Sequence, residues 1–234
     1  MFRLFFTPEW FNGWDIVFNV VSLLIAFLIA GYSWRIYRVN KDTKYAYFSL
    51  AFILVFVGLL FKSFTSGVLY FFPVREVVAD VLRPVAGQSL QLSELFYRGA
   101  FFVQMMAMLS AWLLIFVISQ KSRARLSKFY EVSQIGLFIY LVLLISIVSN
   151  FQYTVFYLTS AVLLSLIVLN YYKSYLNSGN KNTKKIMQAF MLILMGNVFF
   201  IFVFLFQSFY AVGEILVLLG FLFLLYTYNK VKRR

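Results

Sequence analysis

The stretch that decides the fold is NKDTKYAYFSLAFILVFVGLLF, residues 40–61, and NKNTKKIMQAFMLILMGNVFF at residues 180–200 repeats its pattern. NKDTK matches NKNTK, and AFILVFVGLLF matches AFMLILMGNVFF when a gap of two residues is allowed. Gly58 then corresponds to Gly196. Each stretch begins with a basic turn and continues as a long apolar run. The pattern therefore predicts two membrane helices that run in the same direction.

The composition requires a solvent other than water. Of the 234 residues, 63% are hydrophobic and only 12% are charged, whereas soluble domains have about 25% charged residues. A chain of this size cannot hide so much apolar surface from water, so we predict that a lipid bilayer surrounds it. No segment outside the apolar runs is long enough to form a separate core. Residues 1–234 are therefore predicted to form a single membrane domain.

About 20 apolar residues are needed for a helix to cross the hydrocarbon layer. Seven segments of the sequence meet this requirement, so we predict an all-α, polytopic membrane protein with a seven-transmembrane helix bundle. The predicted spans are residues 13–35, 46–72, 95–119, 132–149, 152–173, 185–207 and 209–229.

The basic residues predict the orientation of the bundle. Sixteen of the 21 follow spans one, three, five and seven, whereas six of the eight acidic residues lie on the other side. An excess of lysine and arginine marks the cytoplasmic face. The N-terminus is therefore predicted outside and the C-terminus in the cytoplasm, in a plasma or cytoplasmic membrane. We interpret the net charge of +13 as a topology signal with some attraction to anionic lipid, rather than as a nucleic-acid site.

Spans one to three are predicted to be a parallel repeat of spans five to seven. A three-helix unit reverses the direction of the chain, so a parallel copy needs one further crossing, which span four supplies. FYRG at residues 96–99 and FYAVG at residues 209–213 precede equivalent spans. Parallel repeats are a known plan of transport proteins, with the binding site at the interface of the repeats.

The 3+1+3 plan resembles the sugar-transporting SWEET and PQ-loop families, which implies small-solute transport. The seven helices and external N-terminus resemble rhodopsins and G-protein-coupled receptors, which implies ligand sensing, and the whole chain resembles small prokaryotic seven-helix membrane proteins. Span seven has no lysine, so retinal is not expected. No PQ dipeptide occurs, and Pro8, Pro73 and Pro84 all lie outside the predicted spans.

Histidine and cysteine are both absent from the sequence. These residues supply the ligands of most zinc, haem and iron–sulfur sites, so we expect no metal and no cofactor. The sequence also contains no pairing of a nucleophile with a base and no phosphate-binding glycine loop. We therefore expect that the protein is not an enzyme.

Lys62 is the most informative residue, because a charge within a span is costly and is usually functional. It lies in the outer third of span two, roughly 24 Å from the inner end of the span at 1.5 Å per residue. Gly58, Thr65 and Ser66 share its helical face, which favours an inward orientation. Three interpretations remain open: a polar pocket open to the outside, a lysine that reaches the outer headgroups, and a buried pair with Glu214 or Asp15 that only fixes helix packing.

Other polar side chains lie at a similar depth and complete the candidate ligand site. Asn197 lies in the middle of span six, next to the repeated glycine. Gln104 shares a face with Ala100, Ala107 and Ala111, which favours a role in helix packing. The candidate ligand-binding residues are Lys62, Asp15, Glu94, Arg98, Glu214, Asn197 and Gln104.

The connection between spans two and three contains VREVVADVLRP, in which valine and leucine fall on one helical face. This pattern predicts an interfacial amphipathic helix over residues 74–83 that ends before Pro84. It is either a lid over the site or a passive strap.

The position of the charged residues favours one class of function. Because Lys62 and the acidic residues gather on the outer side, we expect a receptor-like sensor or small-ligand-binding module. The alternatives are a small-solute carrier and a structural or assembly subunit, for which the Ser22, Ala26 and Ala30 seam on span one would provide a contact surface. A cytoplasmic or membrane protein partner and a homo-oligomer both remain open.

Overall fold

The computed structural model describes residues 8–11, 13–70, 89–120 and 153–232. Within this part of the chain, six long α-helices follow a short 3-10 helix, η1 (Glu9–Phe11). The predicted span at 132–149 and the predicted amphipathic segment at 74–83 lie outside the described residues. The six helices are α1 (Trp14–Asn40), α2 (Thr43–Tyr70), α4 (Ser89–Ser119), α6 (Tyr153–Ser178), α7 (Lys181–Ile201) and α8 (Ser208–Lys232).

All six helices are long and apolar enough to cross a membrane. Their outward faces carry large apolar side chains, such as Leu24 and Phe27 on α1 and Leu158 and Val162 on α6. In water, so large an exposed apolar surface would cause aggregation. In a bilayer the same surface contacts the lipid chains, so the described part of the protein is a membrane-embedded helix bundle.

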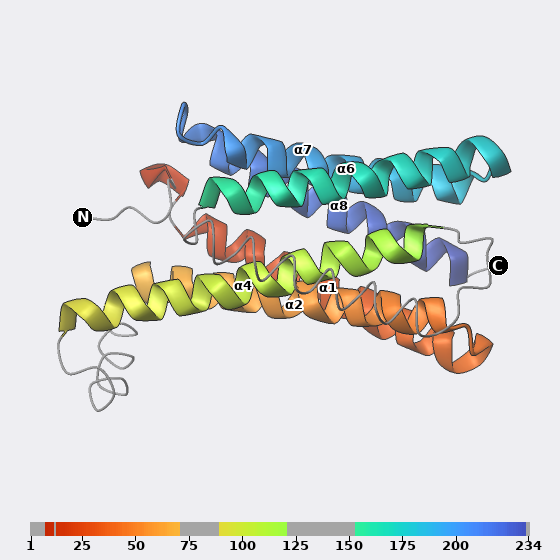
Figure 1. The fold of residues 1–234 in the computed structure, drawn as a ribbon, viewed down its shortest axis with the longest axis horizontal. Coiled ribbons are helices and arrows are strands. Elements are labelled where there is room, and N and C mark those ends of the chain that lie inside the picture. Colours follow the sequence, from red (N-terminus) through yellow and green to blue (C-terminus); the bar gives the residue numbers. More distant parts are fainter. Residues whose placement is uncertain (1–7, 12, 71–88, 121–152, 233–234) are drawn as a thin grey trace.

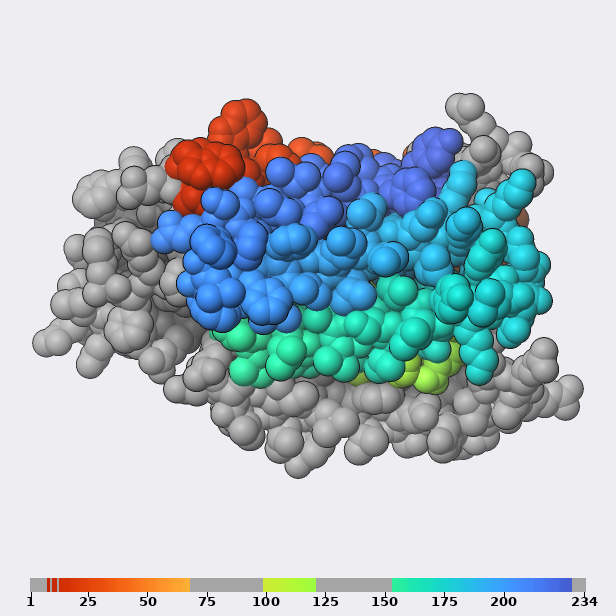
Figure 2. Space-filling model, turned by 90° about the horizontal axis from the view of Figure 1, so that it is seen from above, coloured from red at the N-terminus to blue at the C-terminus, as the bar shows by residue number. Residues whose placement is uncertain are grey.

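The six helices form a closed ring. Neighbours along the chain pack against each other, and the ring closes where α4 packs against α6 and α8 packs against α1. Figure 1 shows α2 and α4 on one side of the bundle and α6 and α7 on the other. Figure 2 shows α7 lying between α6 and α8 on one face of the molecule.

The α4–α6 contact, one of the two that close the ring, is between parallel helices. Phe101 on α4 stacks on Tyr153 at the beginning of α6, with ring centroids 5.9 Å apart. At the other end, Asn170 on α6 donates a hydrogen bond of 3.0 Å to Ser119 on α4. The chain therefore leaves α4 at one end of the bundle and enters α6 at the opposite end (Figure 1).

The α1–α2 and α6–α7 turns have the same geometry. Lys41 and Gly179 adopt left-handed conformations, with φ of 56° and 62°. Each donates its backbone N–H to the carbonyl oxygen of a tyrosine four residues earlier, at 2.8 Å. The next residue in each turn, Asp42 or Asn180, accepts a hydrogen bond at the N-terminus of the following helix. These are standard helix-ending and helix-capping arrangements.

Equivalent residues in the two turns are 138 positions apart, as Lys41 is from Gly179. The same spacing relates the last residues of α1 and α6 and the first residues of α2 and α7. The sequence alignment with its gap of two residues is therefore wrong at the turns, where NKD at 40–42 corresponds to SGN at 178–180. Beyond the gap, the alignment already has the spacing that the structure gives.

The two matched glycines occupy equivalent helix contacts. A Cβ atom on Gly58 would lie 2.6 Å from Cγ of Met108 on α4, and one on Gly196 would lie 2.7 Å from Cγ2 of Val217 on α8. Both distances are too short for a real contact. Glycine therefore lets α2 approach α4, and α7 approach α8, more closely than any other residue would.

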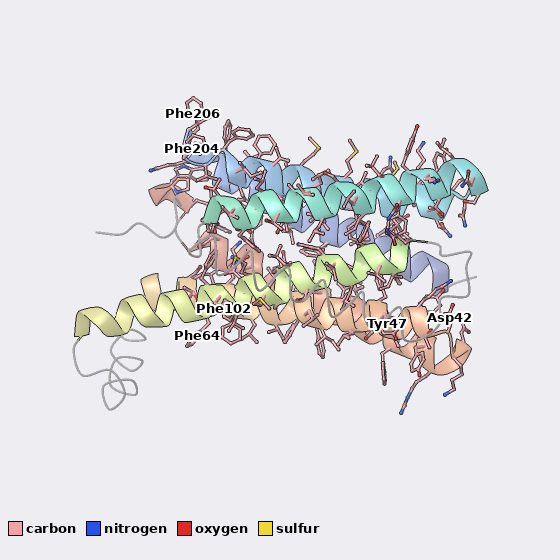
Figure 3. All side chains as sticks on the ribbon, viewed as in Figure 1. Asp42, Tyr47, Phe64, Phe102, Phe204 and Phe206 are labelled. Atoms are coloured by element: carbon pink, nitrogen blue, oxygen red, sulfur yellow. The ribbon has the colours of Figure 1, made fainter. Side chains whose placement is uncertain are left out.

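The end of α7 differs from the prediction. The sixth span was predicted to reach residue 207, but α7 ends at Ile201 and the chain continues in turns. Phe202 donates its N–H to the carbonyl of Phe199, only three residues back, at 3.1 Å. Phe204 and Phe206 follow and are 62% and 65% exposed, pointing away from the bundle in Figure 3.

The small-residue seam on α1 does not face lipid. Ser22, Ala26 and Ala30 are all buried within the bundle, and the hydroxyl of Ser49 on α2 donates a hydrogen bond of 2.9 Å to the carbonyl of Ala30. The seam therefore lies inside the bundle, with Ala30 in contact with α2. It does not offer the contact surface that an assembly subunit would need.

Candidate functional site

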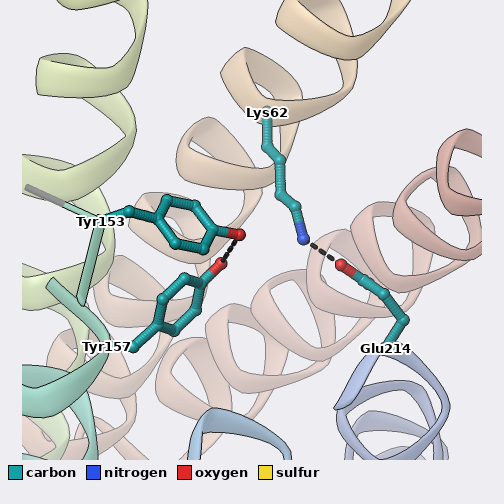
Figure 4. Close-up of polar contacts among 4 residues, drawn as sticks. All are labelled: Lys62, Tyr153, Tyr157 and Glu214. Atoms are coloured by element: carbon teal, nitrogen blue, oxygen red, sulfur yellow. Dashed lines mark hydrogen bonds and ion pairs between the residues drawn. The ribbon is translucent and has the colours of Figure 1, made fainter. Parts of the chain in front are cut away.

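The centre of the site is an ion pair between Lys62 on α2 and Glu214 on α8. The Lys62 ammonium group donates a hydrogen bond to Oε1 of Glu214 (Figure 4). The two residues are only 5% and 3% exposed. Because α2 and α8 belong to different halves of the ring, the pair links the two halves inside the bundle.

Aromatic rings surround the Lys62 ammonium group. Its nitrogen lies 5.4 Å from the ring centroid of Phe200 and 5.7 Å from that of Tyr210. The faces of aromatic rings attract cations, and the attraction is stronger where water is excluded. The Lys62 ammonium group therefore lies inside the bundle. The interpretation in which it reaches the outer headgroups is wrong, because Glu214 and these two rings hold it inside.

Two tyrosines at the beginning of α6 form a second wall of the site. The hydroxyl groups of Tyr153 and Tyr157 are 2.8 Å apart and lie beside Lys62 in Figure 4. Tyr157 interacts electrostatically with Lys62, and its ring centroid is 4.6 Å from that of Phe200. α6 and α7 thus contribute a hydroxyl-bearing and an apolar surface to the same site.

α1 contributes a second carboxylate and an amide. Asp15 and Asn19 are each 1% exposed, one helical turn apart on α1. The Gly13 N–H donates a hydrogen bond of 3.2 Å to Oδ1 of Asp15, and the Asp15 charge also acts on Lys62. The described part of the site therefore draws charged groups from three helices.

Two buried polar atoms near this cluster have no hydrogen-bond partner in the described structure. They are the hydroxyl oxygen of Tyr210, one helical turn before Glu214, and Nδ2 of Asn19, one turn after Asp15. A buried polar group without a partner costs about 1–3 kcal/mol. A bound polar molecule that reached either atom would recover part of this cost.

The structure brings together three of the predicted site residues, Asp15, Lys62 and Glu214. Glu94 and Arg98 lie on the first turns of α4, where side chains are not described. Asn197 is buried on α7, and its amide donates to the Ile193 carbonyl of its own helix at 2.8 Å.

Gln104 is also buried, and its backbone carbonyl lies 3.4 Å from the position a Cβ atom on Gly58 would occupy. This contact brings the α4 backbone against Gly58 on α2. Among the described contacts, neither Gln104 nor Asn197 forms a hydrogen bond or ion pair with Lys62.

The aromatic residues of the site were not predicted from the sequence. Tyrosines in membrane proteins gather at the interface with water, so Tyr153, Tyr157 and Tyr210 did not stand out. Two signals were available. Tyr210 and Glu214 are four residues apart and therefore share a helical face. The spacing of 138 residues also places Tyr153 and Tyr157 at the positions of Asp15 and Asn19.

The composition of the site limits its chemistry. In the described ranges, no group of three or more histidine, cysteine, aspartate or glutamate side chains could hold a metal ion. What the site presents is one ammonium group, two carboxylates, three tyrosine hydroxyls and an amide within aromatic walls. Such groups can bind and orient a small polar molecule.

Six apolar helices with an apolar outer surface define the class of the protein, a helical integral membrane protein. No protein-family model matches the sequence, and no match was found among curated proteins or solved structures. The function must therefore be argued from the bundle and its buried polar site.

Proposed function

We propose that this membrane protein is a receptor-like sensor that binds a small polar ligand around Lys62 and Glu214. The observation that carries the proposal is the buried ion pair between the two halves of a largely apolar bundle, next to two buried donors without partners. A polar ligand at the ion pair could bond to the Tyr210 hydroxyl and the Asn19 amide, which have no partner in the described structure. Under this proposal the protein binds its ligand without catalysing a reaction.

Ligand binding would act through competition for the ion pair. A ligand carboxylate or hydroxyl that bonded to Lys62 would displace Glu214, and a buried charge that loses its partner costs about 3–5 kcal/mol. This cost would be relieved by movement of α8 relative to α2. A ligand shifts the population of states by its differential affinity for them. α8 ends at the basic end of the bundle, where a cytoplasmic partner would detect the movement.

We also propose that α1–α2–α4 and α6–α7–α8 are parallel copies of one unit. The order of contacts around the ring supports this. When α1, α2 and α4 are exchanged with α6, α7 and α8, every helix–helix contact of the ring corresponds to another contact of the same ring. The identical turns and the glycine contacts support it further. For the third helices, Gln104 and Met108 near Gly58 take the places of Gly213 and Val217 near Gly196, at a spacing of 109 residues. The match of FYRG with FYAVG, at a spacing of 113, differs from this register by about one helical turn.

The binding site would then lie on the axis between the copies. Lys62 corresponds to Phe200 at the spacing of 138 residues, and these two side chains contact each other. Equivalent residues of two parallel copies meet only close to their common axis. The interface of the repeats is also where parallel-repeat transport proteins bind their substrates.

The proposed topology has seven spans, with the N-terminus outside and the C-terminus in the cytoplasm. Because α4 ends and α6 begins at opposite ends of the bundle, a further crossing by residues 132–149 would connect them. Arg35 and Lys173 lie at the same end, next to the ends of α8 and α4. This arrangement supports a cytoplasmic location for that end.

The test is a thermal-shift screen of small polar compounds against the protein in lipid nanodiscs. The wild type should be stabilised by at least one compound, because a ligand at 100 times its Kd adds about 2.7 kcal/mol. Lys62→Met should abolish the shift, and Lys184→Met is the matched control because Lys184 lies on the exposed surface of α7. A compound that stabilised wild type and Lys62→Met equally would contradict the proposal.

A small-solute carrier is the second candidate, and the parallel arrangement of the two helix sets favours it. A carrier would need a path to both sides of the membrane, whereas a sensor only needs the outer site. Proteoliposomes loaded with a compound from the screen would separate the two. Exchange of labelled compound that depends on Lys62 would indicate a carrier, and binding without exchange would indicate a sensor.

A further inference from the structure

Two clefts lie at the end of the bundle away from Lys62, one at each place where the ring closes. The cleft between α4 and α6 has a volume of about 750 Å³, and that between α1 and α8 has a volume of about 340 Å³. The α4–α6 cleft is lined by Ser119, Gln120, Asn170, Lys173, Ser174, Asn177 and Ser178. The α1–α8 cleft is lined by Tyr32, Arg35, Ile36, Val39, Asn40, Tyr45 and Tyr228.

The two clefts are built from equivalent positions. All five α1 residues of one cleft correspond, at the spacing of 138 residues, to the five α6 residues of the other. Arg35 corresponds to Lys173, so each cleft has one basic residue. Ile36 corresponds to Ser174 and Val39 to Asn177, so apolar side chains in one cleft are replaced by polar ones in the other.

The membrane does not explain this difference. Equivalent positions of two parallel helices lie at the same depth and meet the same solvent. One cleft nevertheless has an aromatic and aliphatic lining, and the other has a lining of hydroxyl and amide groups. The polar lining of the α4–α6 cleft therefore points to a ligand.

The α4–α6 cleft is suited to an anion. Each of its lining side chains can donate a hydrogen bond, and none of them is a carboxylate. The Asn170–Ser119 hydrogen bond joins its two walls. Within the described ranges, no hydrogen bond or ion pair engages the side chains of Lys173, Ser174 or Asn177. These three groups lie within two turns of α6 and are available to a ligand.

We propose that the α4–α6 cleft binds a phosphate group, carried by an anionic lipid headgroup or by a small soluble molecule. Lysine, serine and asparagine are side chains that bind phosphate oxygens. Basic pockets between helices on the cytoplasmic side of a membrane bind anionic headgroups. The cleft lies at the basic end of the bundle, so either source of phosphate can reach it.

The test measures binding of short-chain phosphatidylglycerol and of glycerol phosphate to the full chain in nanodiscs of zwitterionic lipid. We expect wild type to bind at least one of the two. Lys173→Gln should weaken that binding at least tenfold, because it removes the charged hydrogen-bond donor. Arg35→Gln, which makes the same change in the equivalent cleft, should have no effect.

A second variant keeps the charge and changes only the lining. Ser174→Ile with Asn177→Val copies the α1–α8 cleft at exposed or half-exposed positions, so folding should be preserved. This double variant should also lose binding.

Binding of phosphatidylglycerol alone would identify a lipid site, and binding of glycerol phosphate would identify a soluble ligand. Absence of both in wild type, or equal losses in Lys173→Gln and Arg35→Gln, would overturn the proposal.

Discussion

Lys62 illustrates what one residue reveals in an apolar sequence. Its helical face predicted an inward orientation, and Lys62, Thr65 and Ser66 are all buried. The sequence also placed Glu214 and Asp15 at a similar depth but did not decide between them. The partner of Lys62 depends on how α8 and α1 are rotated relative to α2. This rotation is determined by the packing of segments that are distant in the sequence. Helical periodicity within α2 carries no information about it.

The ion pair should behave as a coupled unit in unfolding experiments. Lys62→Met or Glu214→Leu alone should destabilise the protein by about 3–5 kcal/mol, because each leaves one buried charge without its partner. The double variant should recover most of this loss. Unfolding of all three variants in the same detergent measures the coupling. Additive losses in the double variant would contradict the pairing.

At the scale of the helical elements, the turns and glycine contacts were only partly predictable. The NKDTK motif marked the turn correctly, but the left-handed residues are Lys41 and Gly179, which are not aligned in the motif. The end of α7 was missed because FFIFVFLF contains no proline, glycine or charge that would stop a helix. The chain leaves the helix there with a hydrogen bond from Phe202 to the carbonyl of Phe199, which no residue type in this run marks.

Lys41 holds a left-handed conformation that glycine adopts without strain. Lys41→Gly should therefore stabilise the α1–α2 turn by about 1 kcal/mol, whereas Gly179→Ala should destabilise the equivalent turn by a similar amount. The free energy of unfolding of each variant, compared with wild type, measures both effects. Opposite signs are expected, and two losses of equal size would refute the equivalence of the turns.

The matched glycines should differ in their tolerance to alanine. A Cβ atom on Gly196 would lie 2.8 Å from the backbone oxygen of Gly213. A Cβ atom on Gly58 would instead have its closest contacts with the flexible Met108 side chain. Gly196→Ala should therefore cost about 2–3 kcal/mol, and Gly58→Ala about 1 kcal/mol.

Gly31 provides the control for this pair. No atom lies within 4 Å of the position of its Cβ, so Gly31→Ala should stabilise α1 by about 0.5–1 kcal/mol. The three free energies of unfolding should fall in the order Gly31→Ala, Gly58→Ala, Gly196→Ala, from most to least stable. A smaller loss for Gly196→Ala than for Gly58→Ala would contradict the close approach of α7 and α8.

At the scale of the whole molecule, composition and charge placement were the strongest signals. They predicted an all-helical membrane bundle, and the six described helices agree with that class. The closed ring was not predictable, because contacts such as α4 with α6 join segments far apart in the chain. The two clefts were not predictable either, because the sequence does not show which residues line a cleft between distant helices.

The orientation is directly testable because the chain contains no cysteine. Gln207 in the α7–α8 turn and Ser178 at the end of α6 are exposed, lie at opposite ends of the bundle and can each be replaced by a single cysteine. A membrane-impermeant maleimide added to intact cells should label Gln207→Cys and leave Ser178→Cys unlabelled until the membrane is opened. The reverse labelling would place the C-terminus outside.

An experimental structure of the wild-type protein in lipid nanodiscs tests the central claim most directly, through the density around the Lys62 ammonium group. We predict Lys62 directed into the bundle, with density for a bound polar molecule that contacts Lys62 in place of Glu214 and reaches the Tyr210 hydroxyl or the Asn19 amide. A Lys62 side chain directed to the headgroups, with carbon atoms packed against both of these polar groups, would contradict the proposed ligand site.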